Sequence, residues 1–419
     1  MKKFLFIICS VVLYSCHSAQ NDKDMSKKSI VKAGIDVLKK NNFDVLKGKR
    51  IGLITNPTGV DQNLKSTIDI LYDAKDVKLV ALFGPEHGVR GDYPAGEHVD
   101  FFVDPYTKLP VYSIYGKTKK PTPEMLKDVD AIVYDIQDNG CRSYTFISAM
   151  GLAMEACAEN DKEFIVLDRP NPLTGIKVEG NIVEDEYVSY ISQYKIPYIY
   201  GLTCGELARL LNEEGMLKDG KKCKLTIVKM EGWKRSMTYD ETGLKWIMPS
   251  PHVPTSEISY YYPASGILGE LGVISIGVGY TLPFKVFAAE WIKSKELADK
   301  LNSYNLPGVV FRPITFRPFY AFGQGKQLNG VQFYIEDFLK VDLISIQFYF
   351  MQACKELHPE KDFFAEADKS RIGMFDKALG TNKVREIFSK SYKYSDIKEF
   401  LYKDVAKFKE LSKKYYLYD

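Results

Sequence analysis

The chain has 419 residues, of which 45% are hydrophobic and 26% are charged, a composition typical of globular proteins rather than of disordered or collagen-like chains. Lys and Arg, 57 in all, nearly balance 54 Asp and Glu, and the net charge of +3 gives no electrostatic reason to expect a nucleic-acid partner. The length favours two domains or one large one.

Residues 1–15 are predicted to be a signal peptide, since two lysines precede an apolar run that is too short to remain in a bilayer as a spanning helix. The run ends at Leu13-Tyr14-Ser15-Cys16, which resembles a bacterial lipobox. Residues 16–29 are polar and are predicted to form a tether. We therefore expect a lipoprotein of the cell envelope, anchored to a membrane through lipidated Cys16 and facing the periplasm or the cell surface. The alternative is an ordinary secretory signal in which this cysteine is incidental.

Once Cys9 and Cys16 are set aside, the remaining cysteines are odd in number, which leaves at least one free thiol. None of them is spaced as CxxC, so a zinc ribbon or thioredoxin-like site is excluded. We expect most of them to be small buried hydrophobic residues. They are Cys141, Cys157, Cys204, Cys223 and Cys354.

From residue 30 onward, short apolar runs alternate with segments of helical periodicity. The expected strands are 50–55, 77–83, 111–115, 131–134, 164–167 and 225–230. The expected helices are 30–47, 63–74, a segment that starts at Pro123–Leu126, 144–160, and one that the capping box Thr203-x-x-Glu206 opens and that runs to about 214. Continuous apolar strands alternating with helices predict an α/β domain with a parallel sheet covered on both faces, over residues 30–250.

A second, smaller α+β domain is expected over residues 251–419. The stretch 243–283 is rich in Pro, Gly, Ser and Tyr and is interpreted as long ordered loops. Beyond it, strands are expected near 309–317 and 330–335, and helices near 294–304, 341–357, 374–380, 384–389 and 395–412.

Four of the expected strands end in polar clusters. The clusters are Asn56-Pro57-Thr58, Glu86-His87-Gly88-Val89-Arg90, Asp135-Ile136-Gln137-Asp138 with Arg142, and Asp168-Arg169-Pro170-Asn171. Because ligands bind outside the carboxyl ends of strands in such sheets, we expect these side chains to form one site. Any one of the aspartates alone could equally cap a helix or a turn. The carboxylates, arginines and histidine together suit general acid–base chemistry on a polar, anionic substrate.

The sequence contains no complete motif for phosphate binding, dinucleotide binding, esterase catalysis or metal binding. Gly116-Lys117-Thr118 lacks the upstream glycine of a phosphate-binding loop, and Gly277-Val278-Gly279 lacks the third glycine of a dinucleotide fingerprint. There is no G-x-S-x-G nucleophile elbow. Glu86-His87 and Glu97-His98 have no third metal ligand at a recognisable spacing, so neither a metal nor another cofactor is expected.

The segment Phe83-Gly84-Pro85-Glu86-His87-Gly88-Val89-Arg90-Gly91 resembles the NamZ-type exo-β-N-acetylmuramidases, a family formerly described as a domain of unknown function. The resemblance extends over essentially everything after the tether. It continues through Ala95–Glu97, Tyr134–Gly140, Arg142–Thr145, Leu167–Pro172, Val178–Gly180, Gly201–Ala208 and Pro249–Thr255.

The resemblance implies a Rossmann-like catalytic domain, a smaller C-terminal domain, and an active cleft between them. It implies release of N-acetylmuramic acid from the non-reducing end of peptidoglycan fragments, with Glu86 as the catalytic acid. Asp135 is the first candidate for the residue that assists Glu86, and Asp138 and Glu270 also qualify. The expected substrate-binding residues are Asn56, His87, Arg90, Gln137, Asp138, Arg142, Tyr144, Asp168, Arg169, Asn171, Glu179 and Glu270.

These expectations agree with the chemistry of the substrate. Glycoside hydrolysis needs a carboxyl group that protonates the leaving oxygen. Muramic acid carries a lactyl carboxylate, which an arginine can hold through two parallel hydrogen bonds. Whether the reaction retains or inverts configuration depends on the separation of the two carboxyl groups or on assistance by the N-acetyl group.

The chain departs from the family pattern at one place. Many relatives have Glu-Gly-Thr-Asn-x-Ser-Glu-Gly-Arg-Gly-Thr where this chain has the segment Glu270–Tyr280, and the inner Glu and Arg are replaced by Ile276 and Val278. One interpretation is a changed substrate, which leaves open a glycosidase for a different acidic amino sugar. The other is a buried strand, Val273–Val278. A non-catalytic muropeptide-binding lipoprotein is a further alternative.

Overall fold

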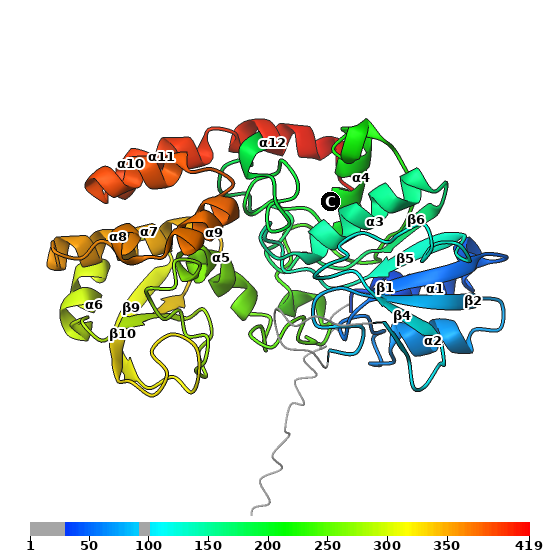
Figure 1. Cartoon of the computed structure of the whole chain (residues 1–419), viewed down its shortest axis with the longest axis horizontal. Helices are drawn as coiled ribbons and strands as arrows, with labels where there is room; N and C mark the ends of the chain where they lie inside the picture. The colour runs from blue at the N-terminus through cyan, green and yellow to red at the C-terminus, as the bar shows by residue number, and fades with distance from the viewer. Residues whose placement is uncertain (1–29, 92–100) are drawn as a thin grey trace, which may run out of the picture.

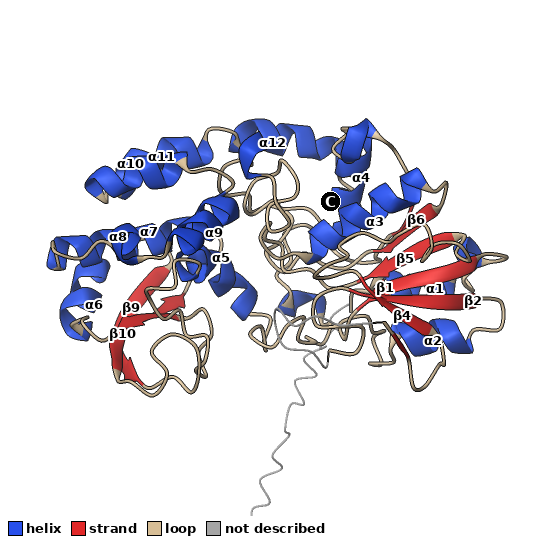
Figure 2. Ribbon diagram, viewed as in Figure 1, coloured by secondary structure: helices blue, strands red, loops and turns tan. Residues whose placement is uncertain are grey.

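The computed structural model describes residues 30–91 and 101–419 of the chain. The expected signal peptide, the tether and lipidated Cys16 lie outside the described residues, as do the motif Ala95–Glu97 and the pair Glu97-His98. The described chain forms two lobes, each built on its own sheet (Figures 1 and 2).

The first lobe contains a seven-stranded sheet in the order β3-β4-β2-β1-β5-β6-β7. All neighbouring pairs are parallel except β3 and β4, so β3 is an antiparallel edge strand. Sequence predicted every strand of this sheet except β3. The strands are β1 (Arg50–Thr55), β2 (Lys78–Gly84), β3 (Phe102–Val103), β4 (Pro110–Ser113), β5 (Ala131–Asp135), β6 (Glu163–Leu167) and β7 (Lys224–Val228).

Helices cover both faces of this sheet, which explains why its strands are apolar throughout. In β5, Ala131 and Val133 belong to the same hydrophobic cluster as α1 (Gly34–Lys40) and α2 (Thr67–Asp73), whereas Ile132 and Tyr134 belong to the cluster of α3 and α4. The bounds of the latter helices are α3 (Phe146–Glu159) and α4 (Cys204–Glu213). The predicted capping box opens α4. The α/β fold is thereby confirmed, with its predicted sheet edge formed by the ends of β1, β2, β5 and β6.

The second lobe combines helices with a three-stranded antiparallel sheet in the order β8-β10-β9. Its strands are β8 (Val286–Ala289), β9 (Val309–Phe316) and β10 (Leu328–Ile335). The remaining helices are α5 (Ile258–Gly269), α6 (Ser294–Ser303), α7 (Leu343–Leu357), α8 (Phe363–Glu366), α9 (Lys369–Leu379), α10 (Lys383–Ser391), α11 (Tyr394–Tyr402) and α12 (Val405–Ser412).

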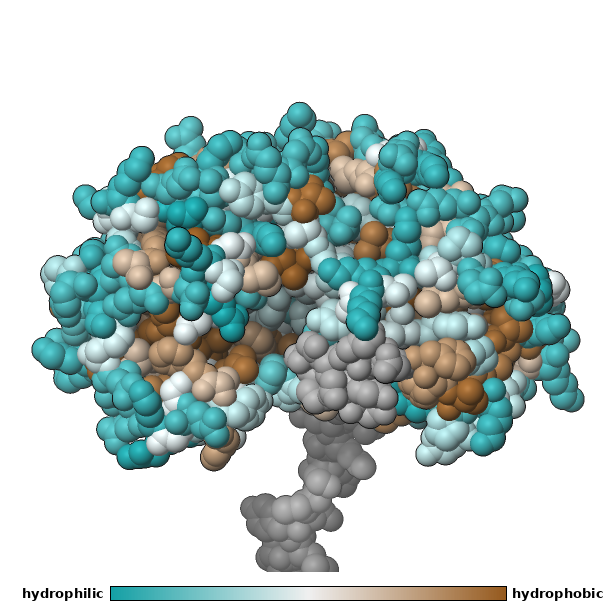
Figure 3. Space-filling view, in the orientation of Figure 1, coloured by the Kyte–Doolittle hydropathy of each residue, from teal (hydrophilic) through white to brown (hydrophobic). Residues whose placement is uncertain are grey.

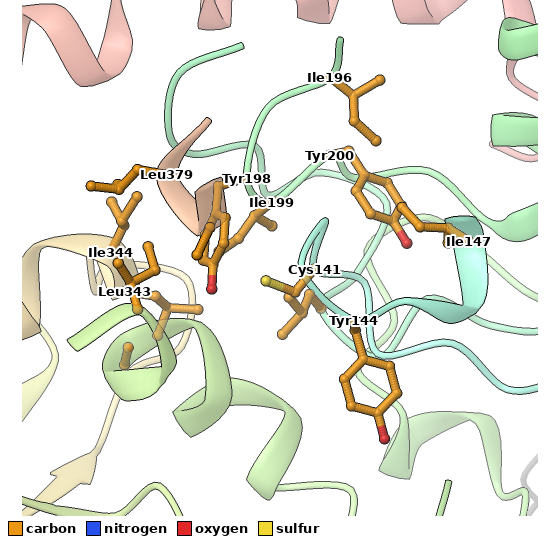
Figure 4. Packing of buried hydrophobic residues seen from close by; sticks show 14 of the residues in the cluster. Cys141, Tyr144, Ile147, Ile196, Tyr198, Ile199, Tyr200, Leu343, Ile344 and Leu379 are labelled. Atoms are coloured by element: carbon orange, nitrogen blue, oxygen red, sulfur yellow. The ribbon is translucent and has the colours of Figure 1, made fainter. Parts of the chain in front are cut away.

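The two lobes share one hydrophobic core. Figure 4 shows Tyr198 of the first lobe among Leu343 and Ile344 of α7 and Leu379 of α9. All the cysteines in the described residues are buried and free, whereas the sequence predicted that most are buried and at least one is free. Cys141 belongs to this shared core.

The C-terminal residues return to the first lobe, where the red end of the chain lies beside α4 (Figure 1). The Leu417 amide donates to Glu206 of α4 at 2.9 Å, and the Tyr418 hydroxyl donates to Asp168 at 2.6 Å. The Arg235 amide donates to the carbonyl of Asp419 at 2.8 Å. The last segment of the chain is therefore part of the first lobe's structure.

Four predictions about individual elements are wrong. Turns occupy residues 123–128 in place of the helix expected from Pro123, and the segment 395–412 divides into α11 and α12. The stretch interpreted as loops contains α5, a helix with Pro263 in its interior and low intrinsic propensity, which burial stabilises. The strand Val273–Val278 is absent: the only strand-like pairing in this described segment is an isolated bridge from Ser275 to Ala288.

On the face shown in Figure 3, hydrophilic residues cover most of the outer surface, and hydrophobic residues gather in the recess beside the left-hand lobe. Within residues 30–91 and 101–419, no helix has the length and apolar character needed to cross a bilayer.

Candidate active-site cleft

A cleft of about 1000 Å³ lies where the two lobes meet. The first lobe contributes the loops that follow β2, β4 and β5, including Glu86, Tyr115 and Tyr144. The second lobe contributes α5 and the segment after it, including Glu270 and Ile276. The site therefore combines the predicted edge of the parallel sheet with a wall that the strand-end rule did not predict.

Glu86 comes from the loop directly after β2 and is half-buried in the cleft. The Thr145 hydroxyl lies 3.4 Å from its Oε2 atom. Tyr115 lies beside Glu86 as well, and burial together with this carboxylate raises the pKa of the tyrosine hydroxyl. His87 follows with a φ of +73°, which is uncommon for a residue with a side chain, and Gly88 continues the left-handed turn. The turn places both Glu86 and His87 in the cleft wall.

Glu270 occupies the C-terminal end of α5 on the side of the second lobe. Burial raises the pKa of its carboxyl group, and the positive charge of Arg371 offsets this in part. Ile276 and Val278 line the same cleft, so the departure from the family pattern falls on the cleft wall.

Aromatic rings and hydroxyl groups form much of the remaining lining. The Tyr144 hydroxyl donates to Ser250 at 2.7 Å, and the Tyr144 and Tyr262 rings meet edge to face at 5.4 Å. The Tyr262 hydroxyl lies 3.1 Å from that of Ser143. Burial lowers the pKa of His252, with a smaller effect from His87. Such a lining suits a sugar, which presents both apolar faces and hydroxyl groups.

The cleft gathers four of the predicted residues, Glu86, His87, Tyr144 and Glu270. Asp135 does not line it. Its carboxylate is fully buried and accepts hydrogen bonds from Arg169 Nε at 2.5 Å, Arg169 Nη2 at 2.9 Å and the Thr67 hydroxyl at 2.5 Å. Asp135 and Arg169 thus form a buried ion pair beneath the strand ends, in which both carboxylate oxygens of Asp135 accept hydrogen bonds from the fold.

Two other predicted acidic residues, Asp168 and Asp138, stabilise a helix end and a loop by accepting hydrogen bonds. Asp168 accepts from the Gly205 amide at 2.8 Å and from the Thr203 hydroxyl at 2.7 Å, so it fixes the start of α4. Asp138 accepts from the Gly140 amide at 2.7 Å and from the Tyr200 hydroxyl. Burial raises the pKa of each of these carboxyl groups to about 6.

Arg142 and Asn171 are also structural. Arg142 is 1% exposed, and its guanidinium donates to backbone carbonyls of both lobes. Burial lowers its pKa to about 10. Asn171 donates to the carbonyl of Leu202 at 2.9 Å and accepts from the Leu173 amide at 2.8 Å. We therefore revise the expectation that these two side chains contact substrate.

Glu179 lies at the junction of the lobes, away from the cleft, and lines a separate hollow of about 400 Å³. It accepts from Lys177 at 2.9 Å and from the Ile344 amide at 3.1 Å. Burial, with the nearby charge of Asp342, raises the pKa of Glu179 to about 7.

The last three predicted residues line other depressions. Asn56 and Arg90 line one of about 600 Å³, where Arg90 is paired with Asp104 at 2.8 Å. Gln137 lines another of about 270 Å³, and its amide donates to the carbonyl of Pro170 at 2.7 Å. Several depressions lie along this edge of the sheet. The rule that ligands bind at the carboxyl ends of the strands does not indicate which of them is the active-site cleft.

Several residues of the cleft were not among the predicted site residues. Ser250 belongs to the motif Pro249–Thr255, which was a signal for it, whereas Tyr115, Tyr190, Tyr262 and Arg371 had no sequence signal. Within the part of the chain that the structure describes, no group of three or more His, Cys, Asp or Glu side chains is arranged to hold a metal ion.

Comparison with known proteins agrees with this architecture. The family model for the N-terminal part of the exo-β-N-acetylmuramidase NamZ matches residues 51–257, and the model for its C-terminal part matches residues 260–418. The chain is 46% identical over 401 residues to the peptidoglycan β-N-acetylmuramidase NamZ of Bacillus subtilis (strain 168), with 96% of this chain and 94% of that protein covered.

Two crystal structures of DUF1343 family proteins from Bacteroides fragilis NCTC 9343 have the same fold. One is 60% identical with a TM-score of 0.90, and the other is 30% identical with a TM-score of 0.74. In both cases 93% of this chain and 99% of the other are covered. Over nearly its whole length, in both lobes, the chain belongs to the family of NamZ exo-β-N-acetylmuramidases.

Proposed function

We propose that this protein is an exo-acting glycoside hydrolase that releases N-acetylmuramic acid from the non-reducing end of peptidoglycan fragments, with Glu86 as the catalytic acid. The observation that carries the proposal is the position of Glu86: it follows a strand inside the parallel sheet and lines the cleft of about 1000 Å³ between the lobes of a chain that belongs to this family.

In the reaction, the bond between the anomeric carbon of the terminal sugar and the linking oxygen breaks. Glu86 protonates the departing oxygen, and a water molecule supplies hydroxyl to the anomeric carbon and returns a proton. The tyrosine rings and hydroxyl groups of the cleft bind the faces and hydroxyl groups of the sugar. No metal or other cofactor is part of this proposal.

Glu270 replaces Asp135 as the candidate for the second carboxyl group. It lines the same cleft as Glu86 from the other lobe, whereas Asp135 is closed off by Arg169. Because burial raises the pKa of Glu270, its protonated form persists to higher pH than that of an exposed glutamate. This favours a role in holding the sugar by a hydrogen bond or in proton transfer.

The test uses the soluble chain that starts at Met25 and a defined MurNAc–GlcNAc disaccharide. The wild-type protein is expected to release free N-acetylmuramic acid, and Glu86→Gln is expected to lower kcat/KM by roughly 100- to 10,000-fold. Glu257→Gln is the matched control, because Glu257 pairs with Lys285 at 2.8 Å outside the cleft. Equal activity of Glu86→Gln and the control would refute the role of Glu86.

The apolar Ile276 and Val278 in the cleft wall favour a second candidate, a glycosidase for a different acidic amino sugar. A disaccharide without the lactyl group, tested beside MurNAc–GlcNAc, separates the two. Absence of release from both, with fragments still bound by the wild type and Glu86→Gln alike, would instead indicate a non-catalytic muropeptide-binding protein.

We also propose that the protein is an envelope lipoprotein, anchored through Cys16 and facing the periplasm or the cell surface. The support is the sequence of residues 1–29, where a short apolar run ends in a lipobox-like Cys16 and a polar tether follows. The full chain is expected to fractionate with membranes and to incorporate labelled fatty acid, and Cys16→Ala to do neither. Membrane fractionation of Cys16→Ala equal to that of the wild type would refute the anchor.

A further inference from the structure

Arg371 occupies a distinctive place in the cleft. It is the one Arg or Lys among the described residues that line it, where the acidic residues are Glu86 and Glu270. It comes from the start of α9, which packs against α5 (Figure 1). A Cβ atom placed on Gly272 would lie 3.5 Å from its Nε atom, so the guanidinium group lies beside the backbone just after Glu270.

The guanidinium group of Arg371 is not used by the fold. The side chain is exposed, and among the described residues it makes neither a hydrogen bond nor an ion pair. Its interaction with Glu270 is electrostatic only, without a hydrogen bond. Arg385 on the neighbouring α10 provides a contrast: it makes three hydrogen bonds with Asp376, at 2.9 to 3.1 Å. The donors of Arg371 are therefore available to a ligand in the cleft.

The stability of α9 does not explain this arginine. Arg371 is the third residue of the helix, and the first turn contains no acidic side chain. A cation in the first turn of a helix is unfavourable, since the helix dipole places partial positive charge there. An unpaired arginine at such a position, aimed at a cleft, points to a function in binding an anion.

We propose that Arg371 binds a carboxylate carried by the 3-O-lactyl substituent of the terminal sugar, and that it thereby sets the preference of the cleft for acidic over neutral amino sugars. The inference rests on the proposed glycosidase function. A guanidinium group offers two parallel N–H donors that match a carboxylate. Ile276 and Val278 offer no charge from the same wall, so the described cleft has no other permanent cation for this purpose.

The carboxylate can come from two sources, the free lactyl group or a peptide attached to it. Three disaccharides distinguish them: MurNAc–GlcNAc with a free lactyl acid, the same sugar as the lactyl methylamide, and the same sugar with an L-Ala-D-isoglutamate dipeptide on the lactyl group. Lys369→Gln is the matched control, because Lys369 is exposed in the same helical turn and lies outside the cleft.

Arg371→Gln is expected to lower kcat/KM for the free acid about 10- to 100-fold, mainly through KM, as is usual for the loss of a charge-assisted hydrogen bond. The rate on the methylamide and every rate of Lys369→Gln are expected to remain unchanged. A loss confined to the dipeptide substrate supports the proposal with the peptide as the source of the carboxylate. An equal loss on acid and amide, or no loss on either acidic substrate, overturns it. Absence of release by the wild type from all three refutes the glycosidase itself.

Discussion

Replacing Arg142 by methionine tests whether this buried arginine joins the two lobes or contacts substrate. Every N–H donor of its guanidinium is engaged: Nε donates to Ser192 at 3.1 Å, and the two terminal nitrogens donate to backbone carbonyls at 2.6 to 3.1 Å. Those carbonyls belong to Asn181 and Ile196 of the first lobe and to Ala378 and Leu379 at the end of α9.

Methionine has similar length but no donor, so Arg142→Met leaves five acceptors without this partner. At about 1 kcal/mol for each hydrogen bond, the loss is about 5 kcal/mol, and burial of the apolar methionine recovers about 1 kcal/mol. We therefore expect the free energy of unfolding to fall by about 4 kcal/mol, a large part of the 5–15 kcal/mol typical of folded proteins.

Urea unfolding of the soluble chain, followed by circular dichroism, measures this loss. Arg317→Met is the control, because Arg317 is exposed and donates to the Gly325 carbonyl at 3.1 Å, and a loss of at most about 1 kcal/mol is expected there. For the folded fraction of Arg142→Met, KM is expected to stay within about threefold of the wild type. A loss of stability no larger than that of the control, together with a much higher KM, would refute the structural role and return Arg142 to the substrate site.

Two further stability predictions follow from buried groups. Burial raises the pKa of Asp138 from 3.8 to about 6, so the native state binds its proton more tightly than the unfolded chain and this group lowers stability as the pH rises through that interval. Asp138→Asn is therefore expected to raise Tm at pH 7.5 but not at pH 4; an equal shift at both values in thermal unfolding would contradict the sign. Gly330→Ala would place a Cβ atom 1.9 Å from the Phe287 carbonyl oxygen and is expected to cost about 3 kcal/mol or more, whereas Gly373→Ala, in open space on α9, is expected to stabilise by about 0.5–1 kcal/mol. Comparison of their urea midpoints checks both, and a Gly330→Ala midpoint equal to the wild type's would show that the strand can shift to make room.

The sequence predicted the sheet and its functional edge because apolar strand runs and polar strand ends are local patterns. It did not predict which side chains at that edge face the cleft. Asp135 and Asp168 carry carboxyl groups of the kind that act in catalysis, yet both accept hydrogen bonds from buried groups of the fold. Asp135 accepts from Arg169, and Asp168 accepts from the Gly205 amide at the start of α4. This depends on tertiary contacts that no local pattern contains.

The second wall of the cleft was harder still to predict. Its helix α5 contains Pro263 and two glycines, which local propensity assigns to loops, and only packing against α7 makes it helical. Arg371 lies about a hundred residues further along the chain than Glu270. Its relation to the cleft follows from the fold alone.

The return of the C-terminal segment to α4 restricts how the lobes can move. The chain crosses from the first lobe to the second before α5 and crosses back along α12, so the lobes are joined twice (Figure 1). Rotation of one lobe away from the other would bend both crossings and expose part of the hydrophobic core that the lobes share, which is unfavourable. Sugar chains are therefore expected to enter a cleft of nearly constant width, and an enzyme of this construction is suited to the free ends of glycan strands, which can slide in endwise without the lobes parting.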